Sequence, residues 1–427
     1  MLDPDPLIDA RTKGLPPACG DLRLSQIGAQ GWSLLEQDLP LPAALLRDDA
    51  LDNNGRWMRD FVRRTGAQLA PHGKTTLSPQ LFARQIADGA WGITLSTAQH
   101  VKVALAADVK RILLASEPIG PTEIAYLLDE LRADPGLELL CLADSVEGVR
   151  RLETAAAAHP IGRPVEVLLE VGYPGGRAGC RTLDDALQVA RAISASAHLA
   201  LRGVEGFEGL HQFLPADEAA TKVAEFLRTQ VDIAQRLDAE GLFEGRPILT
   251  AGGSAFYDLV MRAFMAARLS QPPEIILRSG CYLTHDAGLY ERSFREVRER
   301  SATARDIDGR FQNALEVWAY VLSIPEPGRA ILGAGRRDFG HDAAMPTPLK
   351  VYRPGRDARP RAAPQGWTVA AVNDQHAHLT LPTKADIAVG DMVALGVSHP
   401  CTTFDKWRLM LVVDEAYRVI SAVQTFF

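Results

Sequence analysis

The sequence contains no apolar run long enough to cross a bilayer and no block of basic residues. Its N-terminus, which is acidic and contains prolines, lacks the basic and apolar regions of a secretory signal. The formal net charge of -7 argues against a nucleic-acid partner. These absences predict a cytoplasmic protein that binds neither a membrane nor a nucleic acid.

Cysteine is also scarce. The chain has five cysteines, and their odd number and wide spacing do not form a disulfide framework. They suit a reducing compartment, in agreement with the expected cytoplasmic location. They are Cys19, Cys141, Cys180, Cys281 and Cys401.

Short apolar segments that favour β-strands alternate with longer helical patterns, several of which begin with a Ser, Thr or Asp cap. With 427 residues, the chain is long enough for one barrel-sized domain and a smaller one. Eight β/α units over roughly 230 residues fit a TIM-type (β/α)8 barrel better than a doubly wound open sheet, which would give a similar alternation. The eight apolar segments comprise residues 68–74, 92–96, 112–116, 137–144, 165–173, 201–209, 247–254 and 273–282.

The alternation stops after Tyr290, and the charged residues 291–310 mark a boundary. Strand-like segments beyond it, separated by prolines and glycines, predict a mainly β domain, with a loop at residues 355–366. These segments comprise residues 314–324, 330–333, 368–372, 378–381, 392–397 and 410–413. A short strand is expected at residues 43–46 and an amphipathic helix at residues 49–64. The chain is therefore interpreted as an α/β protein with an N-terminal extension and strand joining the β domain (1–54), the barrel (55–300) and the C-terminal β domain (301–427).

The first apolar segment ends at Lys74, which is flanked by glycine and two threonines. A lysine at the mouth of a buried strand loses solvation, so its neutral form becomes easier to reach and can attack a carbonyl to form a Schiff base. A solvated surface lysine is the alternative. If the segment is extended, His72 points the same way as Lys74, although a histidine packed in the core explains it almost as well.

The loops after strands seven and eight of a barrel commonly hold phosphate groups. Paired glycines after the seventh segment allow the backbone to approach an anion closely, and the eighth segment offers a second glycine amide and a phenol. A glycine pair alone is often only a turn, but two such loops predict a cofactor phosphate site. Its candidate residues are Gly252, Gly253, Ser254, Gly280, Cys281 and Tyr282.

Two further loops carry candidate residues. Arg177 lies in the glycine-rich loop after the fifth segment, where it meets a phenolate or carboxylate or is a solvated loop cation. Near the C-terminus, His399 and Cys401 are separated by one residue, so on an extended segment both project to one side. Imidazole and thiolate are ligands that Zn²⁺ accepts, and two protein ligands leave positions open for catalysis. A packed cysteine beside a surface histidine is the usual alternative.

Taken together, these motifs resemble those of the fold type III pyridoxal-phosphate enzymes, in the branch of D-serine dehydratases, D-threonine aldolases and related D-amino acid deaminases. The similarity spans most of the chain. The resembling motifs are Pro-His-Gly-Lys-Thr at residues 71–75, around the family's Schiff-base lysine, the glycine-arginine-glycine loop at 172–179, the phosphate loop at 252–254, the Arg-x-Gly turn at 278–280 and the metal-ligand pair His399-Pro-Cys401.

The resemblance implies a dehydratase that converts D-serine or another β-hydroxy D-amino acid into a 2-oxo acid and ammonia. Lys74 would hold pyridoxal 5'-phosphate, Arg177 would lie near its ring hydroxyl, and His399 with Cys401 would bind Zn²⁺ or another divalent metal. A homodimer is also implied. The alternatives are a D-threonine aldolase, which forms glycine and an aldehyde, and a non-catalytic pyridoxal-phosphate carrier, which resembles a barrel without a second domain.

The sequence departs from the family pattern at three places. The family often has arginine at the position of Ala70 and histidine at that of Thr76, so these residues indicate the amino acid deaminase subgroup. Residues 336–346, where alanine racemases of this fold carry a catalytic tyrosine, contain none. Racemisation needs bases on both faces of the α-carbon, so this departure argues against it.

Overall fold

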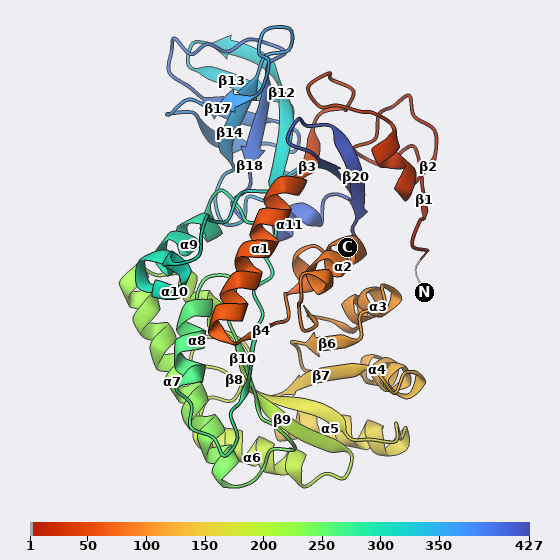
Figure 1. The fold of residues 1–427 in the computed structure, drawn as a ribbon, viewed down its shortest axis with the longest axis vertical. Coiled ribbons are helices and arrows are strands. Elements are labelled where there is room, and N and C mark those ends of the chain that lie inside the picture. The colour runs from red at the N-terminus through yellow and green to blue at the C-terminus, as the bar shows by residue number, and fades with distance from the viewer. Residues whose placement is uncertain (1–2) are drawn as a thin grey trace.

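The computed structural model describes residues 3–427, which form two stacked units (Figure 1). An α/β barrel lies at the bottom of Figure 1 and a β domain at the top. Within the described residues, the barrel sheet is parallel and has eight strands in the order β4, β11, β10, β9, β8, β7, β6, β5. Their bounds are β4 (Gln68–Leu69), β5 (Ile93–Leu95), β6 (Arg111–Leu114), β7 (Glu138–Ala143), β8 (Val165–Val171), β9 (Leu199–Gly206), β10 (Ile248–Ala251) and β11 (Glu274–Leu277).

The sheet closes on itself just beyond β4. His72 forms a parallel bridge with Thr94 of β5, and the amide of Thr94 donates a hydrogen bond to the carbonyl oxygen of Pro71 at 2.9 Å. Parallel strands that close in this way, with helices between them, make a (β/α)8 barrel. The predicted fold class is therefore confirmed, and each of the eight predicted apolar segments overlaps one barrel strand.

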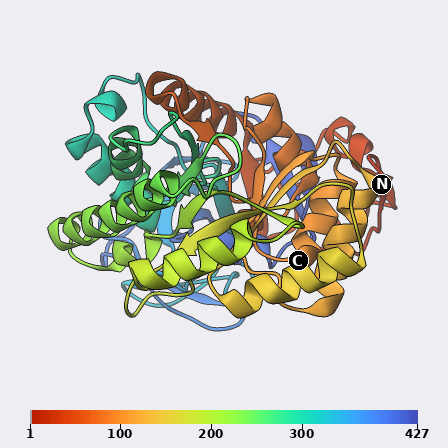
Figure 2. The same cartoon turned by 90° about the horizontal axis from the view of Figure 1, so that it is seen from below.

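Helices surround the barrel strands, as the view from below shows (Figure 2). Leu140, Leu168 and Ile248 pack with one another inside the barrel, whereas Leu139 and Val167 pack into the larger core shared with the helices. Burial on both faces explains why the strands are continuous apolar runs. The helix bounds are α1 (Asp48–Thr65), α2 (Pro79–Ala87), α3 (Ala98–Ala106), α4 (Pro121–Ala133), α5 (Val146–Ala158), α6 (Leu183–Ser194), α7 (Ala216–Ala239), α8 (Tyr257–Met265), α9 (Leu289–Arg300), α10 (Ala302–Arg305) and α11 (Cys401–Phe404). Within residues 3–427, none of the helices combines the length and apolar composition needed to cross a membrane.

The β domain combines C-terminal strands with one strand from the N-terminal part. Its main path runs β15, β14, β18, β12, β13, β17, β16, and β3 pairs antiparallel with β12 and parallel with β19. The predicted mainly β domain and the strand near residues 43–46 are confirmed. The bounds are β3 (Ala43–Arg47), β12 (Leu315–Glu326), β13 (Arg329–Leu332), β14 (Thr347–Tyr352), β15 (Arg361–Ala362), β16 (Thr368–Val372), β17 (Ala377–Thr380), β18 (Met392–Gly396), β19 (Leu409–Val413) and β20 (Val419–Gln424).

Residues 3–40 pack on this domain. Their short elements are β1 (Leu7–Ile8), β2 (Leu22–Arg23) and the 3-10 helix η1 (Leu24–Ala29). Ile8, Leu15 and Ile27 are buried in one cluster with side chains of β3 and β19. Apolar contacts therefore hold this proline-rich segment against the sheet.

Some elements differ from the prediction. Strands β14 and β20 were not predicted, and β15 lies within residues 355–366, where only a loop was expected. Strand β14 contains proline and lysine and is half-exposed over most of its length, so its apolar pattern is weak. Residues 291–310, expected to be only a charged boundary, contain most of α9 and all of α10. Leu289, Phe294 and Val297 face the core between the charged residues of α9.

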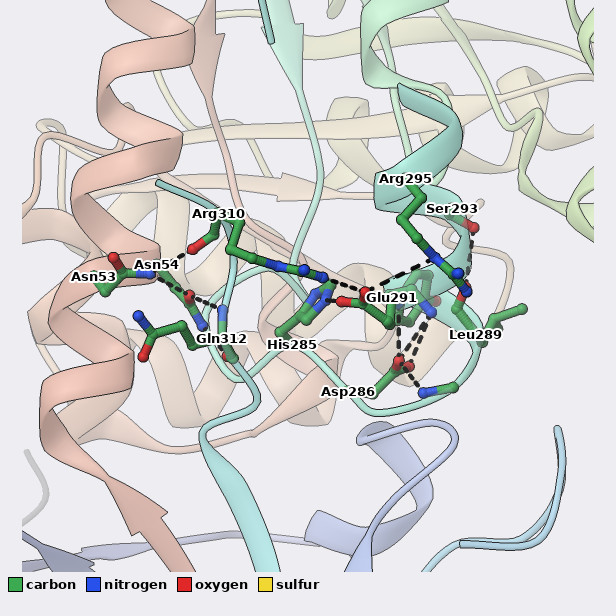
Figure 3. Close-up of polar contacts among 12 residues, drawn as sticks. Asn53, Asn54, His285, Asp286, Leu289, Glu291, Ser293, Arg295, Arg310 and Gln312 are labelled. Carbon is green, nitrogen blue, oxygen red and sulfur yellow. Dashed lines mark hydrogen bonds and ion pairs between the residues drawn. The ribbon is translucent and has the colours of Figure 1, made fainter. Parts of the chain in front are cut away.

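One buried asparagine on α1 links the barrel to the β domain (Figure 3). The Nδ2 atom of Asn54 donates to the carbonyl oxygens of Leu283 at 2.9 Å and Gln312 at 2.7 Å, and its Oδ1 atom accepts from the amide of Gln312 at 2.7 Å. Leu283 follows the last barrel strand, whereas Gln312 precedes β12. The Asn54 side chain therefore joins the two ends of the interdomain segment to α1.

Replacing Asn54 with alanine should destabilise the protein, because it leaves the backbone groups of Leu283 and Gln312 without these partners. We expect the free energy of unfolding in urea to fall by about 1–3 kcal/mol, the cost of unsatisfied buried polar groups. The matched control is Asn53→Ala, which removes an exposed hydrogen bond to the carbonyl oxygen of Arg310 and a half-buried one to the Oδ1 atom of Asn54. It leaves the bonds from Asn54 to the backbone in place and should cost less than about 1 kcal/mol. Equal losses in both variants would contradict the linking role of Asn54.

Candidate active site and metal centre

Lys74 lies at the barrel mouth, in the 3-10 turn η2 (Gly73–Thr75). The expectation of a strand continuing to residue 74 is wrong, because regular pairing ends at β4 and the chain turns after the bridge at His72. A Cβ atom at Gly73 would lie 2.7 Å from a methyl group of Ile93 and 2.8 Å from the ring of Phe82. Gly73 therefore allows the turn that carries Lys74 to pack tightly against Ile93 and Phe82.

The surroundings of Lys74 favour a neutral amine. Burial lowers the pKa of Lys74, and the charge of Arg177 lowers it further, against the opposing effect of the Cys401 thiol. Burial and the charge of Lys74 also lower the pKa of His72. The prediction that His72 points the same way as Lys74 relied on strand alternation, which does not apply because the segment is not a strand there. The effect of the Lys74 charge on His72 nevertheless shows that the imidazole ring lies near Lys74. Its buried Nδ1 atom has no hydrogen-bond partner among residues 3–427.

The two predicted phosphate loops lie next to each other. The amides of Gly252 and Gly253 donate to the Glu208 carboxylate at 3.2 and 2.7 Å, so this loop already holds an anion. The amide of Cys281 donates to the hydroxyl of Ser254 at 3.2 Å, which links the two loops. These contacts form a cradle of backbone amides suited to a phosphate group.

Gly280 and Tyr282 differ in their relation to this cradle. A Cβ atom at Gly280 would lie 2.5 Å from the carbonyl oxygen of His72, so glycine lets the second loop pass close beside the end of β4. The side chain of Tyr282 does not reach the amide cradle, contrary to the prediction. Its ring packs in the core 6.3 Å from that of Phe311, and its hydroxyl accepts from Gln85 at 3.5 Å. Strand β11 ends at Leu277, so the alternation of a strand does not apply at residue 282.

Arg177 is exposed on its loop. Its guanidinium carbon lies 4.3 Å from the ring centroid of Phe207, which follows β9. A cation held over an aromatic ring in this way remains available to a negatively charged ligand.

A set of buried charged residues below the mouth was missed by the sequence reasoning. Arg278 forms an ion pair with Glu205, and the two side chains are only 4% and 2% exposed. Arg278 also donates to the carbonyl oxygen of Gly206 at 2.9 Å. Burial raises the pKa of neighbouring Glu170 to about 10, and the charge of Glu205 adds to this. The available signal was a glutamate near the carboxyl end of both the fifth and the sixth strand, and the two residues, Glu170 and Glu205, pair in register.

Three potential metal ligands converge beside Lys74. The ligating atoms of Cys281, His399 and Cys401 all lie within 4.8 Å of one another. The sequence reasoning placed Cys281 at the cofactor and missed its thiol as a neighbour of the other two. The expectation of an extended segment at residues 399–401 is wrong, since Cys401 begins α11. The turn at Pro400 nevertheless brings the ring and the thiol together.

Neighbouring groups adjust the charge of this cluster. The hydrogen bond with Cys401 lowers the pKa of the Cys281 thiol well below its ordinary value, against the effect of burial. Burial alone would lower the pKa of His399, but Cys281 and Asp342 outweigh it and raise that pKa to about 9. The Nδ1 atom of His399 lies 2.7 Å from Asp342, which leaves the other ring nitrogen for a metal.

A fourth side chain lies against the cluster. The ring centroid of Tyr290 lies 6.0 Å from that of His399, and burial together with the nearby Cys281 and Cys401 thiols raises the pKa of its hydroxyl well above the ordinary value. Tyr290 lies in the first turn of α9. Asp286 caps this helix by accepting hydrogen bonds from the amides of Gly288, Tyr290 and Glu291 (Figure 3). The helix cap therefore sets the position of Tyr290 over the cluster.

The site fits the two groups expected from the sequence. A buried lysine with a lowered pKa, an amide cradle that holds a carboxylate, and an unpartnered imidazole nitrogen suit an aldehyde cofactor that carries a phosphate. Two thiols and an imidazole suit a borderline metal such as Zn²⁺.

Both units match known protein families. Residues 46–269, more than half of the chain, match the family model described as "Alanine racemase, N-terminal domain". Residues 314–413 match the one described as "Putative serine dehydratase domain".

Similar proteins cover most of the chain. D-threo-3-hydroxyaspartate dehydratase of Delftia sp. (strain HT23) is 29% identical over 379 residues, which are 86% of this chain and 92% of that protein. D-threonine aldolase of Arthrobacter sp. is 26% identical over 380 residues, 88% of this chain and 89% of that protein. The crystal structure of D-threonine aldolase from Filomicrobium marinum has a TM-score of 0.75 at 22% identity, covers 92% of this chain and 97% of its own, and supports the fold.

These relatives agree with the two family matches and with the observed barrel and β domain. The chain therefore belongs to the fold type III pyridoxal-phosphate enzymes, with an alanine racemase-type barrel and a serine dehydratase-type β domain.

Proposed function

We propose that the protein is a pyridoxal-phosphate- and metal-dependent lyase that dehydrates D-serine or a related β-hydroxy D-amino acid to a 2-oxo acid and ammonia. The observation that carries this proposal is that Lys74 and the metal-ligand cluster share one wall of the barrel mouth. Thr75, next to Lys74, has its hydroxyl 3.6 Å from the sulfur of Cys281 and 3.5 Å from that of Cys401. Lys74 would therefore hold its group beside a metal bound by the cluster.

When bound, the cofactor supplies an electron sink for negative charge at the substrate α-carbon. Lys74 would hold its aldehyde, and its lowered pKa suits it to remove the α-proton with the neutral Nζ atom. The amides of Gly252 and Gly253 would hold the phosphate once the Glu208 carboxylate moves away from them. Arg177 would face the ring hydroxyl from the rim of the mouth.

His399 and Cys401 would hold the divalent metal, and their donor set favours zinc. A metal at this position would supply Lewis acidity for a hydroxyl leaving group. A cysteine-to-alanine mutant of D-threo-3-hydroxyaspartate dehydratase has been described in a metal-free form, which supports a metal in that relative. Zinc itself and the expected homodimer stay predictions.

A D-threonine aldolase is the second candidate, because the relatives include aldolases as well as a dehydratase. Both reactions need the same lysine and metal, but the aldolase breaks the bond between the α- and β-carbons. A non-catalytic carrier is less well supported, since this chain has a β domain whose His399 and Cys401 reach the mouth.

Replacing Lys74 with alanine should abolish the visible absorbance of bound cofactor and lower turnover at least about 10²-fold, because it removes both the attachment point and the base. The control is Lys102→Ala, which changes an exposed lysine of α3 and should preserve both signals. Bound-cofactor absorbance and normal turnover in the Lys74 variant would refute the assignment.

A substrate panel tests the reaction itself. The purified protein would be incubated with D-serine, D-threonine, D-3-hydroxyaspartate and their L forms, with and without a chelator. We expect 2-oxo acid and ammonia from D-substrates, none from the L forms, and loss of activity with the chelator, because the metal assists the leaving hydroxyl. Glycine with an aldehyde as the main product would instead identify the aldolase.

A further inference from the structure

The metal-ligand cluster contains more protein ligands than the His399 and Cys401 pair on which the proposed function rests. We propose that Cys281 is a third ligand, so that the metal is bound by two thiolates and one imidazole. The cysteine lies in the loop after the last barrel strand, 120 residues before Cys401. This site would bind Zn²⁺ or a comparable borderline metal, which prefers sulfur and nitrogen donors.

The distance between the two sulfur atoms supports shared coordination. The sulfurs of Cys281 and Cys401 are 3.7 Å apart. Two thiolates on one tetrahedral zinc ion, each with a bond of about 2.3 Å, are separated by about 3.8 Å. A disulfide would bring them to about 2.0 Å. The pair is therefore spaced for a common ion, and a ring nitrogen of His399 lies within 4.8 Å of both sulfurs.

Each of the other side chains around the cluster has a supporting role. The Thr75 hydroxyl lies within 3.6 Å of both sulfurs and holds them at one place. Asp342 accepts from one ring nitrogen of His399 at 2.7 Å, which orients the other nitrogen. The same carboxylate accepts from Thr402, so its own position is also fixed. Supporting contacts of this kind are typical of metal ligands.

A third ligand has two physical consequences. Cys281 belongs to the barrel whereas His399 and Cys401 belong to the β domain, so the metal would connect the two domains. Three protein ligands also leave one position on a tetrahedral ion. This inference extends the proposed function, because the substrate hydroxyl would then have a single position to occupy.

The number of sulfur ligands can be measured on the unmodified holoenzyme. Zinc K-edge absorption of the purified zinc-loaded protein should show two sulfur atoms at about 2.3 Å per zinc. One sulfur per zinc would overturn the proposal while leaving a metal-dependent lyase intact. Two sulfurs together with failure of the substrate panel would support the ligand set and reject the proposed function.

Variants provide an independent test. In the cobalt-substituted protein, Cys281→Ser should halve the intensity of the thiolate-to-cobalt charge-transfer absorption. In the same variant, most of the rise in thermal unfolding midpoint that zinc causes should be lost. The matched control is Cys180→Ser, another buried cysteine after a barrel strand, whose sulfur contacts the carbonyl oxygen of Asp144. It should keep the full charge-transfer absorption. Unchanged absorption in Cys281→Ser would overturn the proposal.

Discussion

A backbone contact between the exit of the barrel and one loop of the β domain determines the geometry of the whole site. The amide of Ala287 donates to the carbonyl oxygen of Val397 at 3.0 Å, and that of Leu289 donates to Ser398 at 3.3 Å. A Cβ atom at Gly288, between them, would lie 3.0 Å from the Cα atom of Ser398, so glycine is needed for this close approach. The contact brings the loop after β11 against residues 399–401, and the metal-ligand cluster forms where they meet.

Burial at this junction also sets the charges that the chemistry needs. A solvated lysine would be protonated at neutral pH, whereas the lowered pKa of Lys74 makes its neutral form accessible. Below it, the ion pair of Arg278 with Glu205 keeps a cation buried at the base of the mouth. The raised pKa of Glu170 means that this carboxyl is neutral and can donate a hydrogen bond. The barrel thus supplies the environment that the proposed removal of a proton from the substrate α-carbon would need.

Much of the architecture could be predicted because parallel strands buried on both faces leave continuous apolar runs, separated by capped helices. The β domain was less predictable. Strand β14 is half-exposed and contains proline and lysine, so its pairing with β18 stabilises a segment whose own pattern is weak. The periodicity argument also failed at residues 278–282, because strand alternation does not extend past Leu277. That is why Tyr282 points into the core.

The sequence by itself determined the type of fold and the residues whose chemistry is marked by close neighbours, above all Lys74 in its motif and the pair of His399 with Cys401. Only the tertiary structure decided that the Cys281 thiol joins that pair, that Glu208 occupies the amide cradle, and that Arg278 meets Glu205. The reason is physical. A local motif is recorded in adjacent residues, whereas these contacts join segments up to 120 residues apart and depend on barrel closure and domain packing.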